Sequence, residues 1–412
     1  MGTVVPFTGA SRLVLSSQQQ QALDLIGAWF QGDPAEAIEY GFGVDTFTLA
    51  GYAGTGKTTI AKLLPELLGT DVTYAAFTGK AASVLRSKGM PATTLHSILF
   101  RPRENEDKIK QLEDELRSAT GTRRVMVEEA LLELSDNVDF MPVEVGEAPG
   151  LLVVDEYSMV DEWLFDKIAA KFTKVLFLGD PFQLPPVKGN PCPLRPNFTL
   201  TQVHRHAGPL LEAVNMIRDR RIFEGFNNGV FRWVSNKSPE AAELADQDVI
   251  LCHTNATRKA INTRQRKRRG HEGRPRLGEP LVILRNSYAN NVWNGEVHRL
   301  NQEAQLLDRV TLGLRFVGFD QTMEAERACF QPGCLMPRDM AKETRDTRRG
   351  FETSSKPLIC DYGYALTVHK SQGSEWPKVG LLHDYRGAPD TTYWRWLYTC
   401  ASRAREEVLI VG

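Results

Sequence analysis

The sequence predicts an α/β protein with two similar domains, each a parallel sheet with helices on both faces and each interrupted by an inserted module. Short apolar runs, such as "TFTLA" at 46–50 and "KVLFLGD" at 174–180, alternate with segments of helical spacing. This alternation stops between 101 and 149 and again between 278 and 358. At 412 residues the chain also exceeds what one hydrophobic core usually serves, which favours two domains.

The domain boundaries are expected where the alternation stops and resumes. The first sheet domain would occupy 1–100 and 150–195, with a charged helical insertion at 101–149. The second sheet domain would occupy 196–277 and 359–412, with an insertion rich in Gly, Arg and short strand-like runs at 278–358.

The composition excludes several classes of protein. No run of 18 apolar residues is present to span a bilayer, and the start lacks the pattern of a signal peptide, so we expect a cytoplasmic protein without a membrane partner. The six cysteines are scattered without zinc-site spacing, which predicts free thiols. Fifty basic and fifty-one acidic residues leave no global attraction for polyanions, so nucleic-acid affinity must come from local charge. The basic run 258–276 is by itself typical of a solvated helix face.

A phosphate-binding loop is predicted at "GYAGTGKTT", residues 51–59. In such a P-loop the backbone N–H groups at a helix N-terminus point at phosphate oxygens, a lysine neutralises the outer phosphates and a hydroxyl binds magnesium. Lys57 and Thr58 match the last two roles. A strand before the loop and a helix after it make a chance match improbable. The nucleotide-binding residues are therefore expected to be Gly51, Gly54, Thr55, Gly56, Lys57, Thr58 and Thr59.

Two acids follow a second buried strand in "LLVVDEYSM". Asp155 is expected to hold Mg²⁺ together with Thr58, and Glu156 to orient and deprotonate the attacking water. A strand that ends in one solvated acid is common, but the pair after four apolar residues is less so. The two motifs together predict hydrolysis of a nucleoside triphosphate, without indicating what the hydrolysis drives.

A third strand ends in "LGDPFQLPPV", where Gln183 is placed to sense the γ-phosphate. Arg205 in "LTQVHRH" and Arg403 in "YTCASRARE" are candidate arginine fingers, which would supply charge from the far side of a cleft. A lone arginine is usually a surface residue, so charge alone does not identify these two. If the fingers come from the second domain, hydrolysis can open and close the cleft.

The complete set of motifs resembles the superfamily 1 helicases of the 5′→3′ branch. The stretches that carry the resemblance occur in the order of that group: "LSSQQQQAL", "GYAGTGKTT", "AFTGKAA", "TTLHSIL", "VVDEYSM", "LGDPFQLPPV", "LTQVHR", "VILCHTN", "WNGE", "ALTVHKSQGSEW" and "LYTCASRARE". The chain looks like a Dda-like or RecD-like DNA helicase, and its length is most similar to the phage Dda-type members. The resemblance runs from about Leu15 to Gly412 and implies two RecA-like domains.

This resemblance implies a role for each matching residue. Gln19 would read the adenine, Gln372 and Gly373 would lie close to the nucleotide, and Gln183 would couple phosphate to DNA. Short polar side chains would hold the DNA backbone in register without reading its sequence. These strand-contacting residues would be Thr78, Lys80 and His96 on the first domain and Asn255, Asn294, His369, Lys370 and Ser371 on the second.

The sequence departs from the family pattern in four places. Tyr157 stands where a small residue is more common, and Ser402 stands where threonine is usual. The insertion 101–149 should carry the pin that splits the duplex, yet it has no clear hairpin, and Phe140 is only a weak candidate for the wedge. The second insertion would correspond to a barrel-like module that clamps DNA, although 324–356 has no recognisable counterpart.

We therefore expect an enzyme that uses ATP and Mg²⁺ to move 5′→3′ on single-stranded DNA and to unwind duplex, with the direction implied by the resemblance alone. Its DNA partners would be single strands and junctions with duplex, and a monomer would suffice. A single-strand binding protein or other replication or recombination proteins are candidate partners in a bacterial or phage-infected cytosol. Three alternatives remain open: an RNA helicase of the same superfamily, a translocase that needs a partner, and a loader scaffold that uses ATP as a switch.

Overall fold

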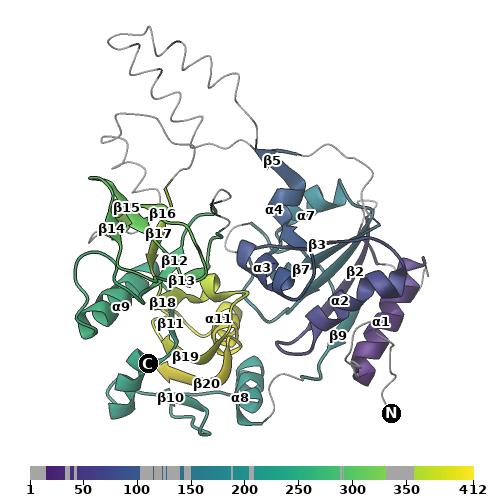
Figure 1. Ribbon diagram of the computed structural model, residues 1–412. Coiled ribbons are helices and arrows are strands. Elements are labelled where there is room, and N and C mark those ends of the chain that lie inside the picture. Colours follow the sequence, from purple (N-terminus) through teal and green to yellow (C-terminus); the bar gives the residue numbers. More distant parts are fainter. Residues whose placement is uncertain are drawn as a thin grey trace.

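The computed structural model describes residues 15–32, 38–40, 44–102, 115, 123, 127, 140–142, 150–186, 189–203, 208–287, 290, 292–330 and 357–412. Two α/β units lie beside one another, the first coloured purple to teal and the second teal-green to yellow (Figure 1). Each is built on its own sheet, as the sequence predicts. Among the described residues, no helix is both long and apolar enough to cross a membrane.

The first sheet has the strand order β1-β2-β8-β7-β3-β4, with β9 paired to β2. All of its pairs are parallel except β1 with β2. The strands are β1 (Ile38–Tyr40), β2 (Val44–Gly51), β3 (Val72–Ala76), β4 (Ala92–Thr94), β7 (Leu151–Asp155), β8 (Lys174–Gly179) and β9 (Phe198–Leu200). Because β9 belongs to this sheet, the first domain continues past the boundary expected at residue 195.

Helices cover both faces of the first sheet. Helices α1 (Ser17–Phe30), α2 (Lys57–Leu68) and α3 (Gly79–Ser87) pack against one face, whereas α4 (Leu95–Leu99) and α7 (Glu162–Ala169) pack against the other. Strand β7 shows why the strands of this sheet are apolar without interruption in the sequence. Leu151 and Val153 face the first group of helices, and Leu152 and Val154 face the second, so every position is buried.

The second sheet is entirely parallel, in the order β10-β20-β19-β11-β18. Its strands are β10 (Phe231–Val234), β11 (Val249–Cys252), β18 (Ala365–Thr367), β19 (Trp376–Leu382) and β20 (Ala404–Val411). Helices α8 (Pro209–Arg218) and α11 (Thr391–Ala401) share one core with the sheet, and α9 (Asn255–Arg268) packs on the opposite face. The predicted fold class is therefore confirmed, with two RecA-like domains of parallel sheet and flanking helices.

The second insertion consists of two small antiparallel sheets around a common core. Its strands are β12 (Pro280–Ile283), β13 (Val297–Arg299), β14 (Gln305–Leu306), β15 (Thr311–Leu314), β16 (Met323–Glu326) and β17 (Cys360–Tyr362), with a short 3₁₀ helix η3 (Arg327–Phe330). In β12, Leu281 and Ile283 face the core of the insertion, while Val282 faces the core of the second domain. The insertion is thus packed onto the second domain, and through β17 it reaches Tyr362 rather than 358.

The first insertion is described mainly through its base, where β5 (Phe100–Pro102) pairs antiparallel with β6 (Phe140–Pro142). Most of 101–149 and the larger part of 324–356 lie outside the described residues, as does the side chain of Phe140. The strand-separating pin therefore stays a prediction. The cysteines within the described part of the chain are free thiols, as predicted.

Candidate active site

The P-loop connects β2 to the N-terminus of α2. Gly54 and Gly56 have φ values of 81° and 88°, which side chains other than glycine rarely adopt, and the loop therefore needs glycine at both positions. Thr55 is fully buried and donates to Tyr52 O at 2.9 Å. Lys57 Nζ donates to Gly51 O at 2.5 Å and to Tyr52 O at 3.1 Å. The lysine thus folds over the loop, and Thr58 and Thr59 follow it in the first turn of α2.

Gln19 contacts the backbone of the P-loop. Its Nε2 donates to Thr55 O at 3.1 Å, and its Oε1 accepts from Ser16 N at 3.0 Å within the capping box of α1. Both ends of this buried amide therefore already have protein partners. The expected role in reading adenine stays a prediction, whereas the contact with the loop is a role that the sequence did not indicate.

Three carboxylates lie at the carboxyl ends of β7 and β8, of which Asp180 is fully buried and Asp155 and Glu156 are half-buried. Asp155 is the last residue of β7, Glu156 follows it, and Asp180 follows β8. Burial, and then the neighbouring Asp155 charge, raise the pKa of Glu156 to about 7. Burial likewise raises the pKa of Asp155 and of Asp180, against the opposing charge of Lys57. Among the described residues no group of three or more acidic, His or Cys side chains is arranged to hold a metal ion, so Mg²⁺ would be held by the expected pair, the Thr58 hydroxyl and Asp155, together with the phosphates.

Glu156 also has an unusual backbone conformation. Its φ of 59° and ψ of 47° lie in the left-handed region, at the start of the 3₁₀ helix η1 (Tyr157–Met159). A residue with a side chain is strained there by about 1–3 kcal/mol, and strain of this kind is concentrated at functional sites. The Asp155 carboxylate accepts a hydrogen bond from Glu156 N at 3.0 Å, which helps to hold this turn.

Gln183 joins the predicted base to the predicted arginine finger across the cleft. With its amide oriented so that both atoms are satisfied, it donates to Glu156 Oε2 at 3.2 Å and accepts from Arg403 Nη2 at 3.1 Å. Arg403 is 4% exposed, and its Nε donates to Thr399 O at 3.1 Å at the end of α11. Three residues expected to be catalytic therefore form one continuous contact from the first domain to the second. Of the other two residues expected to be catalytic, Lys57 lies in the P-loop and Arg205 lies outside the described residues.

Further contacts across the cleft were not anticipated from the sequence. The Tyr398 hydroxyl donates to Asp180 Oδ2 at 2.7 Å, and Leu184 N donates to Thr399 Oγ1 at 3.0 Å. Gln372 Nε2 donates to Leu184 O at 3.2 Å. Asp180 could have been found, because it ends a buried strand as Asp155 does. Tyr398 carries no comparable signal in the sequence.

The strand-contacting residues expected on the first domain follow the carboxyl ends of β3 and β4. Thr78 caps α3 and accepts from Ala81 N at 3.1 Å. Lys80 lies with its Nζ 5.4 Å from the centre of the Trp376 ring, and burial lowers its pKa to about 8 although nearby Glu296 raises it. His96 is exposed on α4. In this conformation Lys80 is thus held by residues of the second domain and its insertion.

The corresponding residues on the second domain follow β18 and β11. His369 and Lys370 lie half-buried on the 3₁₀ helix η4 (Val368–Ser371), and Asn255 begins α9. Ser371 is fully buried, and its hydroxyl donates to Val368 O at 2.7 Å. Asn294 is exposed in the loop before β13. A direct contact of DNA with the Ser371 hydroxyl would therefore require this turn to rearrange.

Trp293 of the second insertion contacts α3, as Trp376 of β19 does through Lys80. The Trp293 ring covers Gly79 so closely that a Cβ at Gly79 would lie 2.6 Å from Trp293 Cγ. The Arg86 guanidinium lies 5.8 Å from the centre of the same ring. A Cβ at Gly373 would similarly meet Ala81 Cβ at 3.3 Å. The two domains therefore touch beside the expected strand path as well as at the nucleotide site.

Comparisons with known proteins agree with this arrangement. Residues 35–227 match the family model described as an AAA domain, and 362–411 match that of a UvrD-like helicase C-terminal domain. The chain is 28% identical over 401 residues to the ATP-dependent RecD2 DNA helicase of Deinococcus radiodurans, covering 88% of this chain and 46% of that protein. It is 30% identical over 190 residues to the ATP-dependent DNA helicase dda of Enterobacteria phage T4, covering 42% of this chain and 37% of that protein. The chain thus spans less than half the length of these two relatives.

The fold has solved counterparts over nearly its whole length. The crystal structure of Bacteroides Pif1 bound to single-stranded DNA superposes with a TM-score of 0.53 at 19% identity, covering 97% of this chain and 92% of that one. A structure of two coordinating Pif1 helicases at forked double-stranded DNA gives 0.53 at 20% identity, with the same coverage. The resemblance predicted from the motifs is therefore confirmed: the chain is similar in sequence to the RecD2 and dda DNA helicases and similar in fold to Pif1.

Proposed function

We propose that this protein is an ATP-dependent DNA helicase that moves 5′→3′ along single-stranded DNA and unwinds duplex by closing and opening the cleft between its two RecA-like domains. The observation that carries the proposal is the position of Gln183 between Glu156 and Arg403. One amide side chain contacts the candidate base on one domain and the candidate finger on the other. A change at the γ-phosphate would therefore alter contacts on both sides of the cleft at once.

The residues divide the chemistry between them. The P-loop backbone and Lys57 would bind the β- and γ-phosphates, and Lys57 would leave its present contacts with Gly51 O and Tyr52 O to do so. Mg²⁺ held by Thr58 and Asp155 would neutralise charge on the phosphate oxygens. Glu156 would accept a proton from the attacking water, for which a pKa of about 7 suits neutral pH. Arg403 would stabilise the charge on the transferred group from the second domain.

The strand path is proposed to run over the carboxyl ends of both parallel sheets. Thr78, Lys80 and His96 follow strands of the first sheet, and His369, Lys370 and Asn255 follow strands of the second. Their polar groups can hold phosphates without reading bases, and binding should therefore weaken with salt. The same edge is where ligands bind in parallel sheets generally. The proposed place of action is the cytosol of a bacterium or a phage-infected cell.

The test is strand displacement with ATP and Mg²⁺ on matched duplexes that carry either a 5′ or a 3′ single-stranded tail, with Lys57→Ala as the inactive control. Unwinding from the 5′ tail alone, lost in the control, is the expected result. Unwinding from the 3′ tail alone would contradict the proposed direction. DNA-stimulated ATP hydrolysis without unwinding would favour a translocase that needs a partner, and stimulation by RNA in preference to DNA would favour an RNA helicase. ATP binding without stimulated hydrolysis would favour a loader scaffold.

A further inference from the structure

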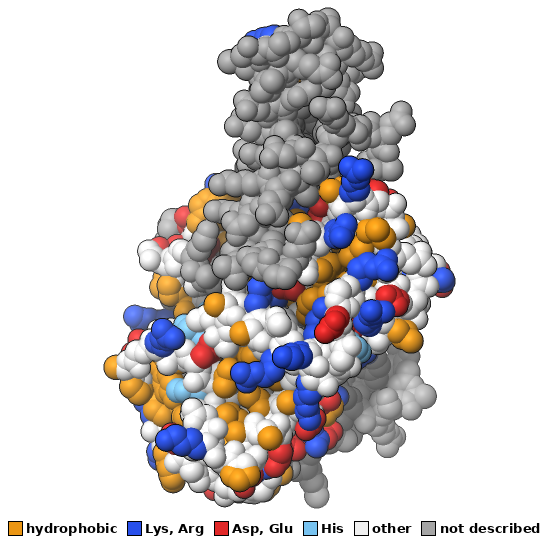
Figure 2. All heavy atoms as spheres, turned by 90° about the vertical axis from the view of Figure 1, so that its left-hand side faces the viewer, with side chains coloured by type: hydrophobic (Ala, Val, Ile, Leu, Met, Phe, Trp, Pro, Cys, Tyr) orange, Lys and Arg blue, Asp and Glu red, His pale blue; other side chains and the backbone are white. Residues whose placement is uncertain are grey.

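The basic run that the sequence analysis left unassigned forms one exposed surface on the second domain. It consists of the C-terminal half of α9 and the loop that follows, and we call it the α9 ridge. Its exposed basic side chains are Arg264, Lys267, Arg268, Arg269, Arg274 and Arg276. Helix α9 lies at the outer left of Figure 1, and Figure 2 shows the molecule from that side, where Lys and Arg side chains make up much of the charged surface.

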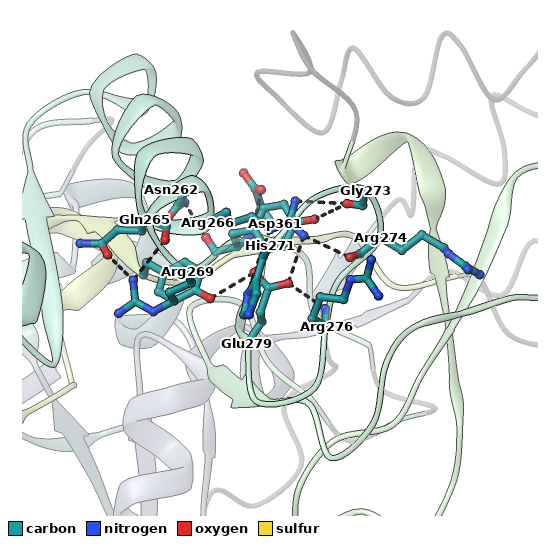
Figure 3. A network of polar contacts seen from close by, with 12 residues as sticks. Asn262, Gln265, Arg266, Arg269, His271, Gly273, Arg274, Arg276, Glu279 and Asp361 are labelled. Atoms are coloured by element: carbon teal, nitrogen blue, oxygen red, sulfur yellow. Dashed lines mark hydrogen bonds and ion pairs between the residues drawn. The ribbon is translucent and has the colours of Figure 1, made fainter.

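The basic residues of α9 that point inward have dedicated acidic partners. Arg258 NH1 lies 2.9 Å from Asp361 Oδ2, and Arg266 Nε lies 2.8 Å from Glu279 Oε1. The Arg266 guanidinium also donates to Gly273 O and Arg274 O, both at 3.1 Å. Figure 3 shows how these contacts draw the loop back against the helix. Two buried ion pairs therefore fix a rigid base on which the outward-facing basic residues stand.

The outward-facing residues are not matched in this way. Within the described part of the chain, no ion pair joins Arg264, Lys267 or Arg274 to another residue. Arg268 pairs with Asp246 and Arg276 with Glu303, but all four side chains are exposed. Exposed pairs of this kind contribute only about 0–1 kcal/mol, so a phosphate group can compete for these arginines. The ridge thus presents a surplus of positive charge on a chain whose formal net charge is −1.

The favourable interaction of basic residues with the helix dipole explains only some of the basic residues of the ridge. Cations in the last turn of a helix interact favourably with its dipole, and Lys267 and Arg268 lie in that turn. Arg274 and Arg276 lie beyond the helix end, where the effect of the dipole has fallen off. Arg264 precedes the last turn. Exposed basic side chains that continue past the end of the helix are better explained by an external polyanion.

We propose that the α9 ridge is a second nucleic-acid contact, which binds the sugar–phosphate backbone of single-stranded DNA after it leaves the cleft. The inference rests on the proposed function, in which Asn255 at the start of α9 lines the strand. The ridge begins at Arg264, and the rise of an α-helix places this residue about 14 Å along α9 from Asn255. Only a strand longer than the cleft can reach it. The contact would hold the strand between steps without reading bases, because the ridge offers guanidinium and ammonium groups.

The experiment compares Arg264→Ala/Lys267→Ala with a matched control, Lys62→Ala/Lys237→Ala, which removes two exposed positive charges elsewhere. Each full-length protein is titrated with oligothymidylates of roughly 8 and roughly 30 nucleotides, lengths that bracket a single compact binding site. For the longer strand we expect the ridge variant to bind several-fold more weakly. The slope of log affinity against log salt should fall by about 1.4, since each lost phosphate contact removes about 0.7 on single strands.

For the shorter strand the ridge variant and the control should both bind like the unchanged protein. The charge-preserving variant Arg264→Lys/Lys267→Arg should retain tight binding of the longer strand, because backbone contacts need charge rather than a particular shape. The proposal is overturned if the ridge variant binds the longer strand with unchanged affinity and salt slope, or if both lengths lose affinity equally. If the unchanged protein binds neither strand, the proposed function itself fails, which is a separate result.

A duplex of about 30 base pairs without tails is included as a further arm. If the ridge variant loses affinity for this duplex and none for the single strand, the ridge binds duplex and the proposal as stated is wrong.

Discussion

The hydroxyl of Tyr398 donates a hydrogen bond to Asp180 Oδ2 at 2.7 Å, and this contact joins the two RecA-like domains beside the nucleotide site. Asp180 is 0% exposed and Tyr398 is 1% exposed. In this conformation neither side chain can therefore form a hydrogen bond with water in place of this contact. A buried acceptor that loses its partner costs about 1–3 kcal/mol. The same hydroxyl also has a backbone hydrogen bond with Ala53 of the P-loop, so Tyr398 of the second domain contacts two parts of the nucleotide site on the first.

Replacement of Tyr398 by phenylalanine should weaken cleft closure. Tyr398→Phe leaves Asp180 Oδ2 without the phenol while keeping the ring that packs 6.0 Å from Phe182. A loss of about 1–3 kcal/mol in the closed state would lower DNA-stimulated ATP hydrolysis by roughly 5- to 150-fold if closure limits the rate. The decrease is measured as the steady-state rate of hydrolysis at saturating ATP and DNA. Tyr393→Phe is the control, because Tyr393 is also buried and its hydroxyl contacts His383 Nε2 away from the cleft. Equal losses in both variants would argue for a general effect on folding.

The contact between Gly79 and Trp293 makes a second prediction. Gly79→Ala places a methyl group against the Trp293 ring, so α3 and the insertion of the second domain must move apart. We expect slower DNA-stimulated hydrolysis, with little change in hydrolysis without DNA. In the double variant Gly79→Ala/Trp293→Ala the ring is gone, and the rate should recover toward that of Trp293→Ala alone. Additive losses, measured as a double-mutant cycle, would mean that the two residues do not act through their contact.

The sequence predicted the sheets and the residues that follow their strands for one physical reason. A parallel strand buried on both faces, such as β7, must be apolar throughout, and its carboxyl end must carry the polar residues that meet the ligand. This logic located Asp155 and Glu156, and the same logic applied to β8 would have located Asp180. The pattern of apolar strands shows which residues lie at the end of their own sheet. It does not show which residues of the other domain they contact.

Contacts between the domains were therefore missed. Tyr398 and Trp293 lie in the quoted motifs "LYTCASRARE" and "WNGE", but the motifs do not show which surfaces face each other across the cleft, and the roles of both residues depend on that. Gln19 shows the same limit, because nothing in its motif indicated that its amide contacts Thr55 O and Ser16 N, and its expected role at the adenine stays a prediction. The pairing of β9 with β2 and the position of β17 beyond 358 were also not indicated by the sequence, because both are three-residue strands with no periodic signal of their own.

Hydrolysis should depend on the protonation of Glu156. Burial and the Asp155 charge raise the pKa of Glu156 to about 7, so its carboxylate is available as a base above that pH and is protonated below it. Mg²⁺ bound at Asp155 would offset the charge that helps to raise this pKa, so the rate at saturating ATP and Mg²⁺ should fall as pH is lowered with a midpoint below 7. Glu156→Gln should lower the rate by about 10²- to 10⁴-fold, as expected for loss of a general base. A Glu156→Gln variant with substantial activity would assign the base to another group.

The raised pKa of Glu156 also predicts how stability without nucleotide depends on pH: a lower pH, which slows hydrolysis, should stabilise the fold. The folded-state pKa of Glu156 is raised from 4.5 to about 7, so the folded protein holds this proton more tightly than the unfolded chain does. The stability that this proton contributes is fully present below pH 4.5 and is lost as pH rises through 7. Glu156→Gln should therefore raise the melting temperature relative to the unchanged protein at pH 8, and much less at pH 4.5. Thermal unfolding at both pH values tests this, and a lower melting temperature of the variant at pH 8 would contradict it.

The buried ion pair between Arg266 and Glu279 should be essential for the attachment of the second insertion. The Glu279 carboxylate accepts from Arg266 at 2.8 and 3.2 Å and from Arg276 N at 2.7 Å, and it is almost fully buried. Glu279→Gln leaves the Arg266 charge without a counter-ion, which should lower the free energy of unfolding by about 3–5 kcal/mol. The exposed pair Arg268–Asp246 on the same helix is the matched control, and Asp246→Asn should cost only about 0–1 kcal/mol. Urea unfolding of the two variants measures the difference. A similar cost in both would mean that the Arg266 charge is solvated when its partner is removed, and that the insertion is held to α9 by its apolar contacts instead.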